Sequence, residues 1–183
     1  MRRVTAIDTA RLRLRPYRDR DLDALHALWT DPDVRRYLWD DMIITRARAA
    51  ETMQASIASM ARHGFGHWAV CAAGADALIG FCGLSCMDET PEIELMYGLA
   101  PAQWGCGFAT EAARAVLRHA FETVGQPRVH AITDVPNRAS IAVLQRLGMQ
   151  FEARCRHHGL DRLRYVITRE AFESATTGRA ARA

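Results

Sequence analysis

Residues 92–124 read EIELMYGLAPAQWGCGFATEAARAVLRHAFETV, and their pattern decides the fold. It predicts a strand that ends at Leu99, a short loop that contains Gly105 and Gly107, and a helix that begins directly after the second glycine. The first N–H groups of a helix have no partner within it, and the helix dipole places partial positive charge beside them. Because glycine has no Cβ, this backbone can approach a ligand closely. The stretch therefore predicts an anion site, suited to a pyrophosphate.

Other interpretations of this turn compete with a pyrophosphate site of this kind. A dinucleotide-binding fingerprint G-x-G-x-x-G would use both glycines, but Thr110 stands at its third glycine and the preceding strands form a meander. A Walker A loop needs a Gly-Lys-Ser/Thr triplet, which the sequence lacks. A pair of loop glycines that binds no ligand stays open.

The rest of the chain surrounds this stretch with strands and helices. Apolar periodicity predicts strands at residues 11–15, 67–73, 77–86, 92–99, 129–135, 149–156 and 160–168. It predicts helices from Asp19 or Asp21 to Trp29, over 45–63, from Gly107 to Val124 and over 138–147, with a short amphipathic piece at 34–39. This order predicts an α+β fold with one mixed, mostly antiparallel sheet of about seven strands and helices on both faces.

Length and composition indicate one globular domain. The chain has 183 residues, 49% of them hydrophobic and 25% charged, and we expect a single domain over residues 1–173 and a disordered tail over 174–183. The net charge is +3 and the arginines are scattered, so no nucleic-acid binding is expected. No run of about 18 apolar residues or signal peptide is recognised, so we expect a cytoplasmic protein without membrane contact.

The cysteines give no indication of a metal site. There are five, at positions 71, 82, 86, 106 and 155, and none forms a C-x-x-C pair. Free thiols in a reducing compartment and no bound metal are expected.

Two blocks of the sequence resemble the GNAT superfamily of acetyltransferases. WGCGFATEA (104–112) is similar to the W-G-x-G-x-A-T-E-A loop of the branch that contains RimJ/RimL-type ribosomal-protein N-acetyltransferases, with Trp104 where most of the family has Gln or Arg. VPNRASIAVLQRLGM (135–149) is similar to that branch's N-x-x-S-x-x-V-L-x-x-L-G-F segment. The opening of the chain resembles the branch as well, so the resemblance covers about residues 9 to 170.

The resemblance implies an acyltransferase with the GNAT fold, which takes acetyl-CoA as co-substrate and needs no metal. Its sheet would splay between the fourth and fifth predicted strands, with the pantetheine arm bound in the gap to the backbone of Tyr97 to Leu99. The loop backbone would hold the pyrophosphate, through Trp104, Gly105, Cys106, Gly107, Phe108, Ala109 and Thr110. Asn137 would either bind the cofactor arm or cap the following helix.

The proton-transfer groups depart from the common family pattern. Leu144 stands where many GNAT enzymes have a tyrosine acid, and Ser140 could serve the thiolate instead, or only satisfy a backbone group. Glu94 aligns with the glutamate of the family's strand-four E-I-G-Y pattern and could take a proton from the amine. It could also be a solvated carboxylate at the strand edge. Met96 replaces the glycine of that pattern.

The sequence says least about the amine that accepts the acetyl group. Tyr37, Trp39 and Glu92 are the candidate acceptor contacts, although core packing is the commoner use of such aromatics. A protein N-terminal α-amine is favoured, because a larger share of it is neutral than of a lysine amine. A small-molecule amine acceptor, a non-catalytic acyl-CoA-binding module and a nucleotide-dependent oxidoreductase are the alternatives. Monomer and homodimer are both compatible with the resemblance.

Overall fold

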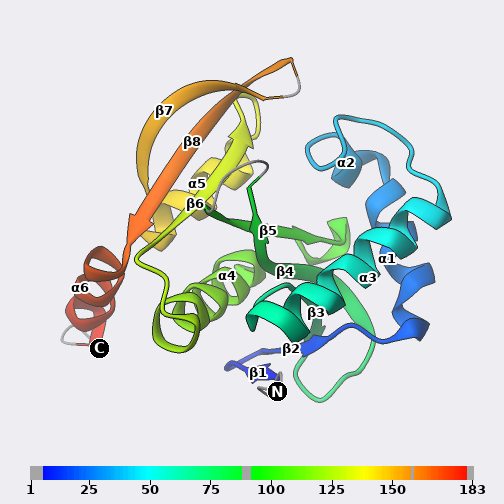
Figure 1. The fold of residues 1–183 in the computed structure, drawn as a ribbon, viewed down its shortest axis with the longest axis horizontal. Coiled ribbons are helices and arrows are strands. Elements are labelled where there is room, and N and C mark those ends of the chain that lie inside the picture. The colour runs from blue at the N-terminus through cyan, green and yellow to red at the C-terminus, as the bar shows by residue number, and fades with distance from the viewer. Residues whose placement is uncertain (1–5, 88–91, 158, 181–183) are drawn as a thin grey trace.

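The sheet of this protein is seen in a computed structural model that describes residues 6–87, 92–157 and 159–180. Within these residues, eight strands form one sheet in the order β1-β2-β3-β4-β5-β6-β8-β7 (Figure 1). The strands are β1 Ile7–Asp8, β2 Leu12–Pro16, β3 His67–Ala72, β4 Leu78–Cys86, β5 Ile93–Leu99, β6 Arg128–Asp134, β7 Gln150–His157 and β8 Leu160–Thr168. Neighbours are antiparallel except β5 and β6, which are parallel, so the predicted mixed sheet is confirmed.

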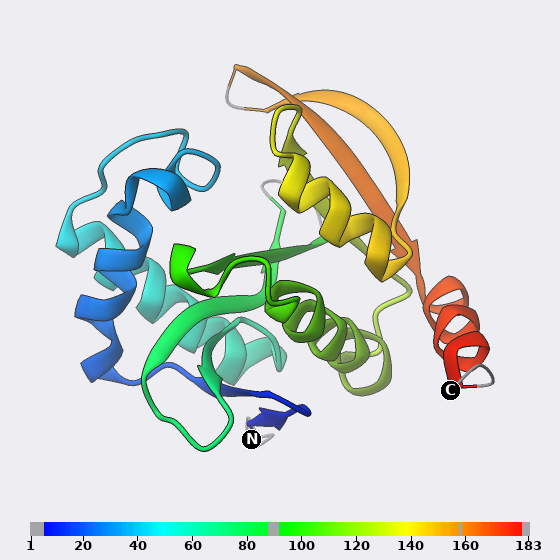
Figure 2. The ribbon, with the colours of Figure 1, turned by 180° about the vertical axis from the view of Figure 1, so that it is seen from behind.

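Helices cover both faces of the sheet. They are the 3-10 helix η1 Asp19–Asp21, α1 Leu22–Thr30, α2 Pro32–Arg35, α3 Arg46–His63, the 3-10 helix η2 Pro101–Gln103, α4 Phe108–Arg118, the π-helix η3 His119–Val124, α5 Arg138–Leu147 and α6 Arg169–Ala180. Helices α1 and α3 lie on one face, and α4 and α5 lie on the other, which faces the viewer in Figure 2. The α+β class expected from the element order is therefore confirmed.

Two apolar clusters hold these layers together. The larger one joins α4 and α5 to the strands, through residues such as Val116, Leu144 and Leu95. The smaller one joins α1 and α3 to the other face, around the fully buried Trp29 and Phe81. Burial of large apolar side chains such as these contributes about 1.5–3 kcal/mol each, so both faces of the sheet are firmly covered.

Local sequence signals fix the ends of the helices. The Thr45 side chain accepts a hydrogen bond from the N–H of Arg48 and caps the start of α3, which ends at Gly64 in the left-handed conformation (φ 78°). Asn137 and Gly148 play the same two roles for α5. These are the residue types that such positions prefer, which is why the predicted bounds agree closely with the structure.

β5 and β6 separate soon after they meet. In the described strands their register pairs Glu94 with His130, and beyond this point the gap is bridged by the Glu94 carboxylate, whose Oε1 accepts a hydrogen bond from the N–H of Ile132 at 3.2 Å. Figure 1 shows the two strands running apart. These are the fourth and fifth strands of the sequence prediction, so the expected splay is present.

The two ends of the chain differ from the sequence prediction. The extra strand β1 is only two residues long and pairs with β2, so it shows no periodicity that could have predicted it. At the other end, α6 continues past Ser174, where a disordered tail is predicted to begin. The reason is Phe172, which is 4% exposed and packs on Phe121 at 5.2 Å between ring centroids. Residues 181–183 of the predicted tail lie outside the described residues.

A search of the described residues for membrane-spanning helices finds none of sufficient length and apolarity.

Candidate active site

One large cleft follows the gap between β5 and β6. Its volume is about 1400 Å³, which exceeds the roughly 300–1,000 Å³ of an ordinary small-molecule pocket. The cleft reaches from the start of α4, past the gap, to α2. It is lined by most of the residues that the sequence nominates, namely Tyr37, Glu94, Tyr97, Leu99, Trp104, Gly105, Gly107, Phe108, Ala109, Thr110, Asn137 and Ser140. Cys106, Trp39 and Glu92 do not line it.

The loop before α4 has the geometry of an anion site. Gly105 and Gly107 both adopt the left-handed conformation, with φ of 75° and 78°, which favours glycine. Gly107 is the N-cap of α4, and no side chain caps this helix start in the described structure. The first amides of α4 therefore remain for a ligand, and the helix dipole adds partial positive charge. The residues present fit a pyrophosphate group.

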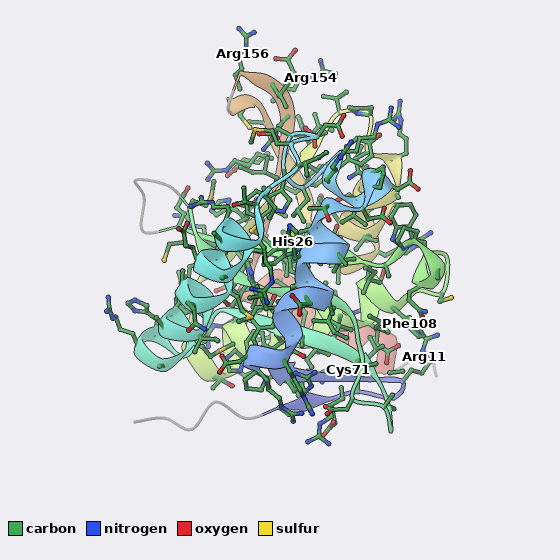
Figure 3. The ribbon with its side chains drawn as sticks, turned by 90° about the vertical axis from the view of Figure 1, so that its right-hand side faces the viewer. Arg11, His26, Cys71, Phe108, Arg154 and Arg156 are labelled. Carbon is green, nitrogen blue, oxygen red and sulfur yellow. The ribbon has the colours of Figure 1, made fainter. Side chains whose placement is uncertain are left out.

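Arg11 braces this loop from the other end of the sequence. Its Nε donates to Glu111 Oε2 at 2.7 Å, and its Nη1 donates to the carbonyl oxygen of Cys106 at 3.0 Å. The guanidinium also lies over the ring of Phe108, 4.8 Å from its centroid, and Figure 3 shows the two side chains together. Thr9 Oγ1 donates to Glu111 Oε1 at 2.7 Å. The N-terminal strands thus hold the loop in shape.

The charge of Glu111 is stabilised by the same contacts. Burial opposes its ionisation, but the hydrogen bonds from Thr9 and Arg11 outweigh burial and lower the pKa of the carboxyl. Glu111 is therefore a carboxylate at neutral pH, and it can hold Arg11 as an ion pair. This brace could not be predicted from the sequence, because about 100 residues separate its partners and no local pattern connects them.

Replacing Arg11 with alanine should weaken the binding of CoA by about 3- to 10-fold, measured by isothermal titration calorimetry. The loop loses one hydrogen bond and a partly exposed ion pair, each worth roughly 0.5–1.5 kcal/mol or less. Arg13→Ala is the matched control, since Arg13 lies two residues away on β2 and pairs only loosely with Asp8 at 3.8 Å. Equal affinities for both variants would show that Arg11 does not support the loop.

Trp104 and Cys106 make contacts within the protein. The indole Nε1 of Trp104 donates to the carbonyl oxygen of Leu99 at 2.7 Å, so that strand carbonyl is already engaged. Cys106 is exposed and lies outside the cleft, and its carbonyl accepts from Arg11. The carbonyl of Cys106 thus serves the brace, and its cofactor contact, expected through the backbone N–H, stays a prediction.

Asn137 and Ser140 begin α5 beside the gap. Asn137 Oδ1 accepts a hydrogen bond from the N–H of Ser140 at 3.0 Å, so the helix-cap interpretation of Asn137 is present in the structure. Ser140 Oγ lies 2.9 Å from the hydroxyl oxygen of Tyr97. Leu144, at the position of the usual tyrosine acid, is buried in the core. Leu144 borders the cleft as an apolar wall, and the hydroxyl pair of Tyr97 and Ser140 supplies the polar groups there.

Glu94 lies in the middle of the sheet. Its strand β5 has β4 on one side and β6 on the other, so the interpretation of Glu94 as a solvated carboxylate at the strand edge is wrong. One carboxylate oxygen accepts from Ile132 as described, and the side chain also lines the cleft. Glu94 is placed both to hold the two strands and to meet a substrate.

One of the three predicted acceptor contacts lies at the cleft. Tyr37 lines the cleft beside α2. Trp39 instead packs edge-on against Trp29, with 5.8 Å between ring centroids, because the apolar layer under α1 takes up its ring. Glu92 lies outside the cleft, where its Oε2 accepts from Arg164 Nη2 at 2.7 Å. The predicted acceptor contacts of Trp39 and Glu92 are therefore corrected.

Glu92 belongs to a charged cluster where β5 meets β6. His130 is fully buried, with Glu92 at 3.4 Å and Glu152 at 3.5 Å, and Arg164 binds both carboxylates. Burial and the charge of Arg164 lower the pKa of His130, against the opposite effect of the two carboxylates. The cluster fastens the closed end of the gap. No group of three or more side chains suited to a metal ion occurs in the described part of the chain.

Comparison with known proteins places this geometry in a family. A family model described as an acetyltransferase (GNAT) domain matches residues 11–150. The uncharacterized N-acetyltransferase p20 of Bacillus licheniformis is 30% identical over 152 residues, which cover 82% of this chain and 85% of that protein. The uncharacterized N-acetyltransferase YoaA of Bacillus subtilis is 27% identical over 83% and 86% of the two chains.

Solved structures share the fold. An acetyltransferase of Agrobacterium tumefaciens superposes with a TM-score of 0.80 at 24% identity, over 91% of this chain and 95% of that one. RimL, a ribosomal L7/L12 alpha-N-protein acetyltransferase solved in complex with coenzyme A, superposes with a TM-score of 0.77 at 19% identity, over 91% and 99%. The chain therefore belongs to the GNAT acetyltransferase family and is an acetyl-CoA-dependent N-acetyltransferase.

Proposed function

We propose that the protein transfers the acetyl group of acetyl-CoA to the N-terminal α-amine of a protein, by direct attack in a ternary complex. The observation that carries this proposal is the continuous cleft, which joins the glycine loop at one end to Tyr37 at the other and passes Glu94 and Ser140 between them. Both substrates can occupy such a cleft together, with the reacting atoms beside Glu94 and Ser140. The structural likeness to RimL, which acts on a protein α-amine, supports the choice of acceptor.

The glycine loop and the gap orient the donor. The free amides at the start of α4 bind the pyrophosphate, and the pantetheine arm lies between β5 and β6 alongside Tyr97. This arrangement brings the thioester close to Ser140 at the start of α5. Holding two reactants in one orientation supplies much of the rate enhancement of such a transfer.

The chemistry in the middle of the cleft needs one base and one group that stabilises the leaving thiolate. The amine nitrogen attacks the acetyl carbon, a C–N bond forms, and the C–S bond breaks with its electron pair on sulfur. The proton that the amine loses passes to Glu94, directly or through water. Ser140 stabilises the sulfur with its hydroxyl. Both side chains line the cleft between the glycine loop and Tyr37, which supports these roles.

The pKa of the acceptor favours an α-amine. With a reference pKa near 7.8, about a quarter of such amines are neutral at about pH 7.4, against roughly a thousandth of lysine amines with a pKa near 10.4. The difference is about 3.5 kcal/mol in the cost of obtaining a neutral nucleophile. Glu94 is a single base that already accepts a hydrogen bond from the N–H of Ile132. It therefore suits an α-amine, which costs less free energy to deprotonate than a lysine amine.

A panel of acceptors tests this function. Free CoA release, followed with a thiol reagent, should be fastest with short peptides that carry a free N-terminus, and should be at least tenfold slower with the same peptides when the N-terminus is blocked and a lysine is the only amine. Polyamines and aminoglycosides complete the panel. Faster release with any of these than with the free N-termini would replace the proposed acceptor with a small-molecule amine. CoA binding without release by any amine would indicate a binding module.

A further inference from the structure

The hydroxyl of Tyr97 lies between the two halves of the cleft. Its oxygen lies 2.9 Å from Ser140 Oγ and 3.4 Å from the carbonyl oxygen of the same residue. Tyr97 comes from the middle of β5 and Ser140 from the first turn of α5, so their contact spans the gap in the sheet. The roles proposed above use only the position of Tyr97 on its strand and leave its hydroxyl without a task.

We propose that Tyr97 is a positioning residue for acetyl transfer, which donates its phenolic hydrogen to Ser140 Oγ and so directs the hydrogen of Ser140 toward the thioester sulfur. This inference rests on the proposed function, because it assigns a task within the same reaction. It also accounts for a chain that lacks the usual tyrosine at Leu144, since a tyrosine from a different element acts through the serine.

The direction of the hydrogen bond follows from burial and distance. Burial raises the pKa of Tyr97, so the phenol keeps its hydrogen at neutral pH. The hydroxyl of the half-buried Tyr97 needs an acceptor, and 2.9 Å to Ser140 Oγ lies within the range of O–H···O bonds, whereas 3.4 Å to the carbonyl lies beyond it. The Ser140 hydroxyl has one hydrogen and two lone pairs. Once it accepts from Tyr97, its own hydrogen is available to another acceptor.

Further contacts fix the positions of Ser140 and Tyr97. Its N–H is held by Asn137 Oδ1 at 3.0 Å, which sets the first turn of α5 in place. The Tyr97 ring packs against the large apolar cluster, and its hydroxyl position is set by that packing. The hydrogen of Ser140 is thus directed before the donor binds, which avoids reorganisation during the reaction.

The proton balance requires no transfer from Tyr97. An ordinary thiol has a pKa near 8.5, so the departing thiolate needs stabilisation by a hydrogen bond more than immediate protonation. Ser140 donates that hydrogen bond as the C–S bond breaks. The proton that leaves the amine through Glu94 or water finally reaches the sulfur and gives free CoA. Tyr97 and Ser140 end the cycle with the hydrogens they had at the start.

A double-mutant cycle tests the proposal with the fastest acceptor of the panel. Tyr97→Phe should lower kcat by about 10-fold, the effect of one hydrogen bond, while the KM for acetyl-CoA changes by less than about twofold. Ser140→Ala should lower kcat at least as much. The variant that combines both should be no slower than Ser140→Ala alone, because the tyrosine acts only through the serine.

Tyr17→Phe is the matched control. Tyr17 is buried, its hydroxyl has no hydrogen-bond partner in the described structure and it does not line the cleft, so kcat should not change. Thermal unfolding of each variant separates lost activity from lost folding. Full kcat in Tyr97→Phe, or losses that multiply in the double variant, would overturn the inference while leaving the acetyltransferase function intact. Absence of CoA release by the unmodified protein would overturn both.

Discussion

Asp21→Asn is expected to lower the free energy of unfolding by about 3 kcal/mol, the lower end of the range for breaking a buried ion pair. Arg15 Nη1 and Nη2 donate to the two oxygens of Asp21 at 2.7 and 2.8 Å, and the side chains are 3% and 5% exposed. The N–H of Arg18 also donates to Asp21, at 2.8 Å. Without the carboxylate, Arg15 retains Asp76 nearby, which limits the loss. Urea unfolding followed by circular dichroism measures the change.

The pH dependence of the free energy of unfolding should also reveal the contribution of the Arg15–Asp21 pair. Burial opposes the charge of Asp21, but the hydrogen bonds and charge of Arg15 outweigh it, so the pKa of Asp21 is lowered by folding. A carboxyl whose pKa is lowered by folding stabilises the fold at pH values above its unfolded-state pKa of about 3.9. This contribution is lost as the pH falls through the pKa of the folded state. The difference between wild type and Asp21→Asn should therefore shrink below about pH 4.

Asp23→Asn serves as the control for this substitution. The carboxylate of Asp23 is 79% exposed and binds Arg46, which is 60% exposed, so its removal should leave the urea midpoint unchanged. An Asp21→Asn variant that unfolds at the wild-type midpoint would show that the buried pair adds no stability.

Glu94→Gln is expected to lower kcat by about 100-fold, the lower end of the range for loss of a general base. Glutamine has nearly the same shape, and its amide oxygen can still accept the hydrogen bond from the N–H of Ile132, so the strands should stay in place. The affinity for CoA should therefore remain within about twofold, because only proton acceptance is lost. Steady-state kinetics with a peptide acceptor and calorimetric titration of CoA measure the two quantities.

Two further variants decide between the roles of Glu94. Glu94→Ala removes the acceptor for Ile132 as well, and should lower both kcat and the melting temperature. Glu51→Gln changes an exposed carboxylate on α3 and should leave all three properties at wild-type values. A Glu94→Gln enzyme with unchanged kcat would show that Glu94 only joins β5 to β6.

Most of the fold could be predicted from the sequence, because its signals are local. The caps at Thr45, Asn137 and Gly148 set helix ends, and alternation sets most of the strands. The failures occur where distant packing decides. The small residues of α6 are typical of a disordered tail, but the burial of Phe172 extends the helix, and no pattern near residue 172 contains that information.

In the candidate site, too, local motifs could be predicted and contacts between distant residues could not. The glycine loop and the start of α5 could be predicted because each is a short, contiguous motif. Aromatic residues near α2 were harder to assign, since the sequence cannot distinguish Tyr37, which lines the cleft, from Trp39, which packs on Trp29. The Arg11 brace and the Tyr97 hydroxyl depend on residues brought together by the sheet, and only the tertiary structure shows them.

The divergence of β5 and β6 gives the molecule an interior sheet edge. Where strands separate, their backbone amides and carbonyls face one another without closing a ladder, and elsewhere in proteins such groups invite pairing with another chain. Here the unpaired groups lie along the cleft, with the start of α5 beside them. The fold thus turns a feature that promotes aggregation at the surface into backbone hydrogen bonds for a molecule that completes the sheet from within the cleft.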